Sequence, residues 1–367
     1  MKFLIVAFHP RSMTPYAQQY EDIIKKNGHD YDILFWDRFS NGCLEKKKNQ
    51  FIFHRICTLG GNRLKKIYPF YLFRKTVKKI IKEGGYDKII VLNTMPGVLL
   101  HDILVKKYAN NYIFDIRDYT YEKYKFYLHV VHDLIKHSFF TAISSRGFKT
   151  FLGESDKFVV NHNISNLEDA CEEPTLYREK KPVTIGFVGA VRYFEENIAL
   201  IKSIQNSDSI KLKFIGRQNN DCLLDAYCKK NKYINVSFLG EFDNKEKPLI
   251  YSTIDIINSV FGNQSLDVIT LLPNRLYDAL IFKKPILTTR GTYLAKVVSE
   301  NDIGLVVDDS KTYTVEQSQK KLLNYVASFD SKKFVENANR LLCSVKREQD
   351  IFHEKISEFV LKSELSS

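Results

Sequence analysis

The sequence is most informative at Leu271-Leu-Pro-Asn-Arg-Leu-Tyr-Asp-Ala-Leu-Ile-Phe-Lys-Lys-Pro-Ile-Leu-Thr-Thr289, where a helical pattern leads into an apolar strand. The free backbone N–H groups at the start of a helix carry partial positive charge and suit a phosphate. Asp278 follows about one turn later, and an ionised carboxylate accepts hydrogen bonds from sugar hydroxyls. Phosphate beside sugar hydroxyls is the outline of a nucleotide, so this stretch predicts a nucleotide site.

Outward from this stretch, short apolar runs alternate with helical patterns along most of the 367 residues. Continuous apolar strands separated by helices are typical of buried parallel sheets with right-handed crossovers. The predicted strands are 3–8, 32–35, 88–92, 112–115, 140–143 and 157–160 in the first half, and 183–188, 211–215, 235–239, 254–258, 285–288 and 303–307 in the second. Two separate helices are expected near 331–342 and 346–364.

The break in this alternation sets the domain boundaries. The segment at 171–182 is polar, contains two prolines and has no periodicity, so it is the predicted linker. We therefore expect an α/β protein of two doubly wound, Rossmann-like domains, at 1–170 and 183–345, that face each other across a cleft. A C-terminal helix at 346–367 is expected to pack back on the first domain. Ligands should bind at the carboxyl ends of the strands.

Composition narrows the cellular setting. The hydrophobic content of 44% fits a packed protein, and no apolar run approaches the roughly 20 residues of a spanning helix. Six scattered cysteines lack a zinc-site spacing, which favours reduced thiols in a cytoplasmic protein. The net charge of +12 favours a polyanionic partner. Because no nucleic-acid-binding motif appears, nucleic acid is not the expected partner.

Basic residues interleaved with aromatics between 46 and 79 account for much of the positive charge. This pattern suits a surface that rests on anionic phospholipid headgroups, so we expect peripheral contact with the inner face of a membrane. The alternative is a solvated helix whose apolar residues enter the core, and the sequence leaves both open.

In the second half, two strands end in a glycine followed by an arginine. Gly189 would let the backbone approach a ligand, and Arg192 and Arg217 could each meet a diphosphate with a charged guanidinium. The alternative is that each glycine only makes a turn and each arginine is solvated. Together with the segment at 273–278, the pattern favours a nucleotide site.

At this point the second half resembles the donor-binding domain of GT-B glycosyltransferases, in particular the large family-4-like group of capsule and O-antigen polysaccharide enzymes. The resemblance rests on the strand–Gly–x–x–Arg opening at 185–192 and on Pro273-Asn-Arg-Leu-Tyr-Asp-Ala-Leu-Ile-Phe-Lys-Lys-Pro-Ile286. It covers most of 183–307. It implies that Asp278 binds the nucleotide ribose, and that Asn274, Arg275 and Leu276 lie against the diphosphate and base.

Two departures from the family pattern bear on mechanism. Asp278 stands where the family usually has Glu, which shortens the reach of the carboxylate by one methylene. Thr270 stands where the retaining enzymes carry a second Glu, so neither the donor sugar nor the stereochemistry carries over. A lysine that often follows the first glycine turn is also missing, which leaves Arg192 and Arg217 to meet the diphosphate charge.

The first half is then expected to bind the acceptor. His9 follows the first strand and has an intrinsic pKa near neutrality, so it is a candidate base. Asp118 lies just past a later strand, in Phe114-Asp-Ile-Arg-Asp118, and is the first candidate for base or acceptor contact. Arg11, Asn93 and Arg117 are the candidate acceptor-binding residues. The ordinary alternatives are a loop histidine bonded to backbone and a structural ion pair around Arg117.

No metal or other cofactor is expected. Asp30-Tyr-Asp32 has the Asp-x-Asp spelling of some metal-dependent glycosyltransferases, but it leads into the second strand, far from the predicted phosphate. Nine histidines form no HExxH motif. Cationic side chains and helix N-termini can stabilise a leaving diphosphate without a metal ion.

The leading hypothesis is a glycosyltransferase that moves a sugar from a nucleotide-sugar, with a UDP-sugar favoured, to a lipid-linked saccharide in surface polysaccharide synthesis. One alternative is a nucleotide-sugar 2-epimerase with a similar two-domain shell. Another is a degenerate, non-catalytic member that acts as a binding subunit.

Overall fold

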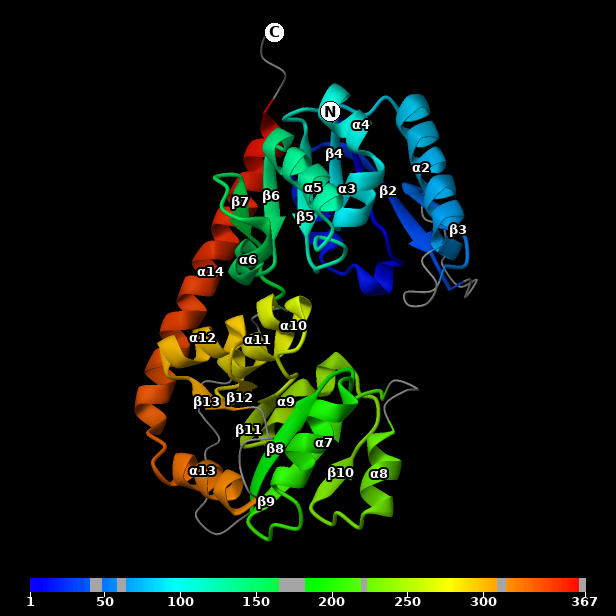
Figure 1. Cartoon of the computed structure of the whole chain (residues 1–367). Coiled ribbons are helices and arrows are strands. Elements are labelled where there is room, and N and C mark those ends of the chain that lie inside the picture. The colour runs from blue at the N-terminus through cyan, green and yellow to red at the C-terminus, as the bar shows by residue number, and fades with distance from the viewer. Residues whose placement is uncertain (40–47, 58–63, 165–181, 219–222, 309–314, 363–367) are drawn as a thin grey trace. The chain divides into compact units, whose positions relative to one another are not determined.

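The computed structural model describes residues 1–39, 48–57, 64–164, 182–218, 223–308 and 315–362. The chain divides into two compact units (Figure 1). Unit 1 comprises Met1–His162 with Arg347–Ser367, and unit 2 comprises Asn163–Lys346. The predicted linker at 171–182 lies outside the described residues except for Pro182.

Unit 1 contains a seven-stranded sheet with the order β3-β2-β1-β4-β5-β6-β7, and all neighbouring strands are parallel. Its strands are β1 (Lys2–Val6), β2 (Asp30–Asp37), β3 (Gln50–His54), β4 (Lys88–Leu92), β5 (Tyr112–Ile116), β6 (Phe140–Ile143) and β7 (Phe158–Val160). Its helices are α1 (Ala17–Lys26), α2 (Leu64–Gly84), α3 (Thr94–Leu99), α4 (His101–Lys107), α5 (Lys125–His137) and α6 (Lys149–Leu152).

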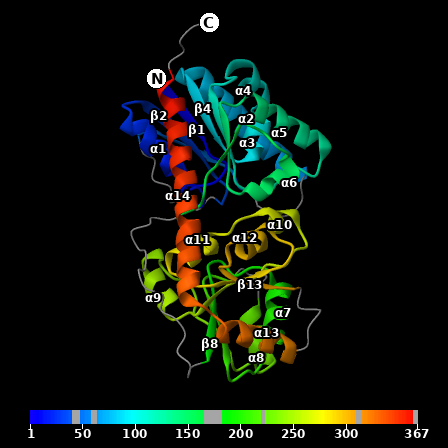
Figure 2. The same cartoon turned by 90° about the vertical axis from the view of Figure 1, so that its left-hand side faces the viewer.

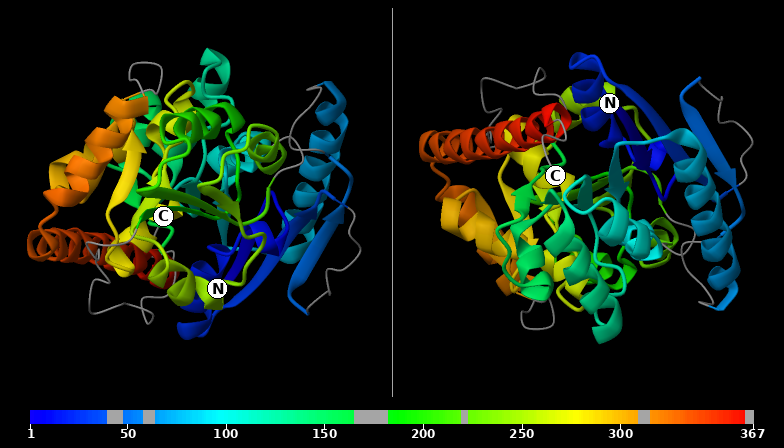
Figure 3. Two further views of the ribbon diagram at one scale, coloured as in Figure 1. Left: turned by 90° about the horizontal axis from the view of Figure 1, so that it is seen from below. Right: turned by 90° about the horizontal axis from the view of Figure 1, so that it is seen from above.

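Alternate side chains of each buried strand enter two apolar layers, because successive residues of a strand point to opposite faces. In β1, Leu4 and Val6 pack in the layer that includes α2 and α5, whereas Phe3 and Ile5 pack with α1 and the end of α14 (Ser331–Leu361). Figure 3 shows the end of α14 beside the first strand.

Unit 2 repeats the design with six parallel strands in the order β10-β9-β8-β11-β12-β13. Its strands are β8 (Val183–Val188), β9 (Ile210–Ile215), β10 (Val236–Phe238), β11 (Ile256–Ser259), β12 (Ile286–Thr289) and β13 (Gly304–Val307). Its helices are α7 (Phe194–Ser203), α8 (Leu224–Lys230), α9 (Lys247–Ser252), α10 (Leu266–Thr270), α11 (Asn274–Ile281), α12 (Tyr293–Asn301) and α13 (Val315–Ala327). Helices α7, α8 and α13 cover one face, and α9, α11, α12 and the start of α14 cover the other.

The strand order positions the candidate sites. In each sheet the first strands are added on one side of the starting strand and the later strands on its other side. This reversal lies between β1 and β4 in unit 1 and between β8 and β11 in unit 2. Ligands of such sheets bind outside the carboxyl ends of the strands at this switch point. His9 and Asn93 follow β1 and β4, and Gly189 follows β8, so the predicted residues lie at these edges.

The C-terminal helix and one edge strand differ from the sequence-based expectation. The helices expected at 331–342 and 346–364 are one continuous helix, α14 (Figure 2). Cys343-Ser-Val-Lys346 contains neither glycine nor proline, so nothing in the backbone ends the helix there. Strand β3 was not predicted. It is an edge strand beside β2, and basic and polar residues surround its short aromatic run.

The last part of α14 packs on the sheet of unit 1. Phe352 and Phe359 are fully buried, and Phe352 meets Tyr20 edge to face at 5.6 Å between ring centroids. Lys88 Nζ donates a hydrogen bond to the carbonyl oxygen of Lys362 at 2.5 Å, which places a cation at the negative end of the helix. Among the residues that the structure describes, no helix combines the length and apolar character needed to cross a bilayer.

Candidate functional site

In unit 2 the turns after β8 and β9 pack directly against each other. Gly189 has a φ of +120° and Gly216 a φ of +139°, conformations that other residues rarely adopt. A Cβ atom on Gly216 would lie 2.0 Å from the carbonyl oxygen of Gly189. Gly216 is therefore needed for the close approach of the two turns, and Gly189 leaves open space in front of the sheet edge.

The two arginines that follow these turns are both exposed. Arg192 is anchored through its carbonyl oxygen, which accepts a hydrogen bond from Asn197 Nδ2 at 2.6 Å. The next residue, Tyr193, has a φ of 64°, an unfavourable conformation for a non-glycine residue that recurs at functional turns. Arg217 lies 3.8 Å from Glu241, and both side chains are about three-quarters exposed, so this pair is weak.

Helix α11 begins at Asn274, as predicted, and its first residues differ sharply in exposure. Asn274 is exposed, and Pro273 before it supplies no side-chain cap, so the first turn is open to a ligand. The Leu276 side chain is buried in the core, so only its backbone is placed for a contact with a base.

Arg275 does not extend toward solvent. Its guanidinium stacks 3.8 Å from the ring centroid of Phe187 and 4.3 Å from that of Phe261. It also donates a hydrogen bond to the Asn258 carbonyl oxygen at 3.3 Å. Burial lowers the pKa of Arg275 to about 10, so the residue stays charged at neutral pH. Arg275 therefore contributes a buried positive charge near Asp278.

Asp278, the predicted ribose ligand, is buried and already has partners. Its Oδ2 accepts a hydrogen bond from Tyr251 Oη at 2.7 Å, and its Oδ1 lies 3.0 Å from Lys247 Nζ. Burial, and then the negative charge of Asp278, raise the pKa of Tyr251 well above its ordinary value, so the phenol stays protonated and donates. Sequence reasoning missed Lys247 and Tyr251, which lie on α9 and belong to no motif.

Three further polar groups at this edge were also missed. Asn258 and Ser259 end β11, and Thr289 ends the adjacent strand β12. All three are buried, and Asn258 Nδ2, Ser259 Oγ and Thr289 Oγ1 have no hydrogen-bond partner among the described residues. Buried polar atoms are usually satisfied, so these groups are candidates for contact with water or a ligand. The sequence signal that could have identified them is a polar residue at the end of an apolar strand.

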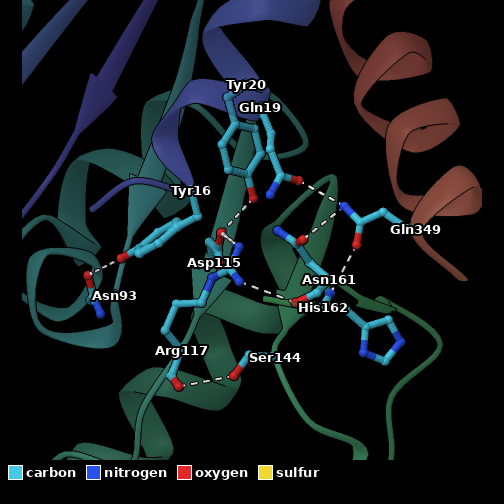
Figure 4. Close-up of polar contacts among 10 residues, drawn as sticks. All are labelled: Tyr16, Gln19, Tyr20, Asn93, Asp115, Arg117, Ser144, Asn161, His162 and Gln349. Atoms are coloured by element: carbon cyan, nitrogen blue, oxygen red, sulfur yellow. Dashed lines mark hydrogen bonds and ion pairs between the residues drawn. The ribbon is translucent and has the colours of Figure 1, made fainter. Parts of the chain in front are cut away.

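In unit 1 the strand ends are joined by a buried polar network (Figure 4). Arg117 Nε lies 2.7 Å from Asp115 Oδ1, and Tyr20 Oη donates to Asp115 Oδ2 at 2.7 Å. The guanidinium also donates to the Asn161 carbonyl oxygen at 3.2 Å and stacks 4.2 Å from the ring centroid of Tyr16. Arg117, a predicted acceptor ligand, therefore forms the structural ion pair that was its alternative.

The other two predicted acceptor-binding residues also have partners within unit 1. Asn93 has a φ of 78°, and its Oδ1 accepts a hydrogen bond from Tyr16 Oη at 2.9 Å. Arg11 forms an ion pair with the buried Glu21 and donates to Gln18 Oε1 at 2.8 Å. The Arg11 contacts hold the loop after β1 to α1, and the Asn93 contact joins the same loop to the end of β4.

The two predicted catalytic residues lie on the same sheet edge. Asp118 follows β5 and is exposed. His9 follows β1 and is half-buried, and its buried Nδ1 has no hydrogen-bond partner among the described residues. Burial, assisted by the positive charge of Arg38, lowers the pKa of His9 to about 4. His9 is therefore neutral at pH 7, the form that accepts a proton.

A second carboxyl group, Glu122, was missed. It is buried in the loop after β5, where its Oε2 accepts a hydrogen bond from the Thr120 N–H and its Oε1 has no hydrogen-bond partner among the described residues. The nearby Tyr127 hydroxyl is buried and has no hydrogen-bond partner within the part of the chain that the structure describes. Burial raises the pKa of Glu122, although backbone N–H groups oppose this. Glu122 thus adds a buried carboxyl group to this edge, beside the candidates that the sequence indicated.

Among the described residues, no three His, Cys, Asp or Glu side chains come together in a geometry that could hold a metal ion.

Comparisons with known proteins address the fold. Neither the family models nor the curated proteins give a match. Sucrose-phosphate synthase from Thermosynechococcus elongatus aligns with a TM-score of 0.70 at 12% identity, over 97% of this chain and 96% of its own. Anabaena HepE in complex with UDP aligns with a TM-score of 0.70 at 11% identity, over 98% and 100%. WaaB, a lipopolysaccharide outer core galactosyltransferase, aligns with a TM-score of 0.65 at 13% identity, over 98% and 99%.

At these identities the likeness concerns the fold alone. The predicted α/β fold with two Rossmann-like domains of the GT-B type is confirmed. The expectation that the two domains face each other across a cleft stays a prediction.

The state of His9 gives the first testable prediction. An NMR titration, with His9→Gln to assign the resonance, should give an imidazole pKa near 4. Between pH 6.5 and 4 the unfolded chain would bind this proton while the folded chain does not, so acidification through that window should reduce stability. The His9→Gln variant should lose less stability over the same window than the wild type. A measured pKa between 6 and 7 would contradict the described burial of the ring.

Proposed function

We propose that this chain is a glycosyltransferase that transfers a sugar from a nucleotide-sugar donor, with a UDP-sugar favoured. The observation that carries the proposal is the edge of unit 2, where exposed Arg192 and Arg217 follow two adjoining glycine turns and Asp278 lies in α11. Support also comes from the shared fold, because HepE was solved with UDP and with UDP-glucose, and WaaG is a glycosyltransferase of lipopolysaccharide biosynthesis.

In this proposal the diphosphate lies at the glycine turns. Gly189 leaves open space there, and the Arg192 and Arg217 guanidinium groups match phosphate oxygens with paired N–H donors. The uncapped first turn of α11 adds backbone N–H groups and a partial positive charge. These fixed cations and dipoles would stabilise the charge that develops on the leaving diphosphate, so no metal ion is required.

The acceptor is assigned to the strand ends of unit 1. Asp118 is the preferred base, because it is exposed on that edge, whereas Asp115 is fully buried against Arg117. His9 is a second candidate, since its neutral imidazole can accept a proton from an acceptor hydroxyl. Asn93 and Arg117 would act indirectly, by fixing the loops that carry the reacting groups.

We further propose a lipid-linked saccharide acceptor in capsule or O-antigen synthesis, met at the cytoplasmic face of the membrane. Helix α2 exposes Leu64, Ile67, Tyr68 and Tyr71, each more than half exposed, while Phe73 and Val77 enter the core. The exposed four follow an i, i+3, i+4, i+7 spacing and so form one apolar stripe. Exposed lysines Lys65, Lys75 and Lys79 on the same helix suit anionic headgroups.

The donor site is tested by nucleotide binding. Arg192→Ala should weaken UDP binding roughly tenfold or more, because a charge-assisted contact to phosphate is lost in the bound state only. The measurement is isothermal titration calorimetry with UDP. The matched control is Lys229→Ala, which removes an exposed cation from α8 in the same unit and should leave affinity unchanged. Equal affinities for the wild type and Arg192→Ala would exclude Arg192 from the site.

The membrane stripe is tested with vesicles. The wild type should bind phosphatidylglycerol vesicles, and binding should fall as salt screens the lysines. Replacing Ile67, Tyr68 and Tyr71 together by Ser should weaken partitioning, by up to roughly tenfold per side chain. Ile234→Ser, at an apolar residue 82% exposed in unit 2, is the control and should bind normally. Vesicle binding that does not depend on lipid charge, or that is unchanged in the triple variant, would contradict the proposal and indicate that α2 is a solvated helix.

A further inference from the structure

We infer that Lys247 contacts the nucleotide ribose together with Asp278, and that this pair makes the site select ribonucleotides over 2′-deoxyribonucleotides. The inference rests on the proposed nucleotide site and goes beyond it, because it assigns sugar recognition to a residue on a different helix.

The carboxylate of Asp278 has little capacity left for a ligand. Two carboxylate oxygens offer about four acceptor positions. Lys247 Nζ lies 3.0 Å from Oδ1 and 3.3 Å from Oδ2, and Tyr251 Oη lies 2.7 Å from Oδ2. The Asp278 side chain is only 6% exposed. About one acceptor position therefore remains for a sugar hydroxyl.

The Lys247 ammonium is better placed to meet a ligand. Its side chain is 17% exposed, nearly three times the fraction of Asp278. An ammonium carries three N–H donors, and Asp278 is the one hydrogen-bond acceptor that Lys247 Nζ contacts among the described residues. At least one N–H is thus left for a hydroxyl oxygen.

The local fold fixes Lys247 in this position. Asp243 and Glu246 form a capping box in the turn before α9, with Asp243 Oδ1 accepting from the Lys245 N–H at 2.9 Å. Lys247 is the first residue of α9 and Tyr251 follows four residues later, so both side chains lie on one face of the helix. That face meets Asp278, so the lysine and the phenol reach the same carboxylate.

Asp278 stands where the family pattern has glutamate, and this difference explains why Lys247 would take part in binding the ribose. The shorter side chain keeps the carboxylate beside Lys247 rather than extended toward the ligand. A ribose hydroxyl can donate one hydrogen bond and accept another. It can therefore bridge the pair, donating to Asp278 and accepting from Lys247. A 2′-deoxyribose lacks the hydroxyl and leaves an N–H of Lys247 without its partner in the complex, which a site of this kind penalises strongly.

The test compares UDP with 2′-deoxy-UDP by isothermal titration calorimetry. The wild type should bind UDP tighter by roughly tenfold or more. Lys247→Met should bind UDP more weakly and bring the ratio of the two affinities close to one. Lys245→Met is the matched control, because Lys245 is exposed and lies two residues away, and it should keep the wild-type ratio.

Removing Lys247 alone leaves the buried Asp278 carboxylate without its cationic partner, which could destabilise the fold. The folding of this variant is therefore checked by thermal melting. The double variant Lys247→Met with Asp278→Asn removes both charges, should fold, and should also fail to distinguish the two nucleotides. A wild type that binds UDP without discrimination, or a Lys247→Met or double variant that retains the wild-type ratio, overturns the inference. A wild type that binds neither nucleotide overturns the proposed function itself.

Discussion

The buried carboxylate of Asp278 is the constraint on which the edge of unit 2 depends. A charge removed from water must be paired and hydrogen-bonded, and deleting one partner of such a pair typically costs about 3–5 kcal/mol. Lys247 and Tyr251 supply the direct contacts from α9. Arg275 adds positive charge near Asp278 while it stacks on Phe187 at the β8 side of the sheet. One carboxylate on α11 thus joins that helix to α9.

In unit 1 a buried carboxylate at the sheet edge is also paired, because Asp115 forms an ion pair with Arg117. Both side chains are almost fully buried, Tyr20 Oη donates to Asp115, and Arg117 donates to the Asn161 carbonyl oxygen. Gln349 of α14 extends the network by donating to Asn161 Oδ1 at 3.2 Å (Figure 4). Because Asp115 and Arg117 are paired with each other, the candidate groups for chemistry on this edge are Asp118, His9 and Glu122.

Much of the fold could be read from the sequence because parallel strands buried on both faces are continuous apolar runs. Strand β3 escaped detection because it is short, lies at the sheet edge and alternates exposed Phe51 with packed Phe53. The unbroken α14 was expected as two helices, although no residue between them breaks a helix.

The sequence indicated where the candidate residues lie in the fold, but not which partners they have. Strand ends correctly indicated the edges where Gly189, Arg192 and Asp118 lie. Whether an arginine is exposed, as Arg192 is, or stacked in the interior, as Arg275 is, depends on aromatic neighbours that are distant in sequence. Lys247 reaches Asp278 across 31 residues.

The central claim is that a nucleoside diphosphate binds at the carboxyl edge of the unit 2 sheet. Hydrogen–deuterium exchange with and without saturating UDP tests it most directly, because bound ligand slows exchange of the amides that it covers. We expect protection at 189–193, 216–218 and 274–278, the turns after β8 and β9 and the start of α11. Protection confined to other segments, or unchanged exchange at saturation, would contradict the claim.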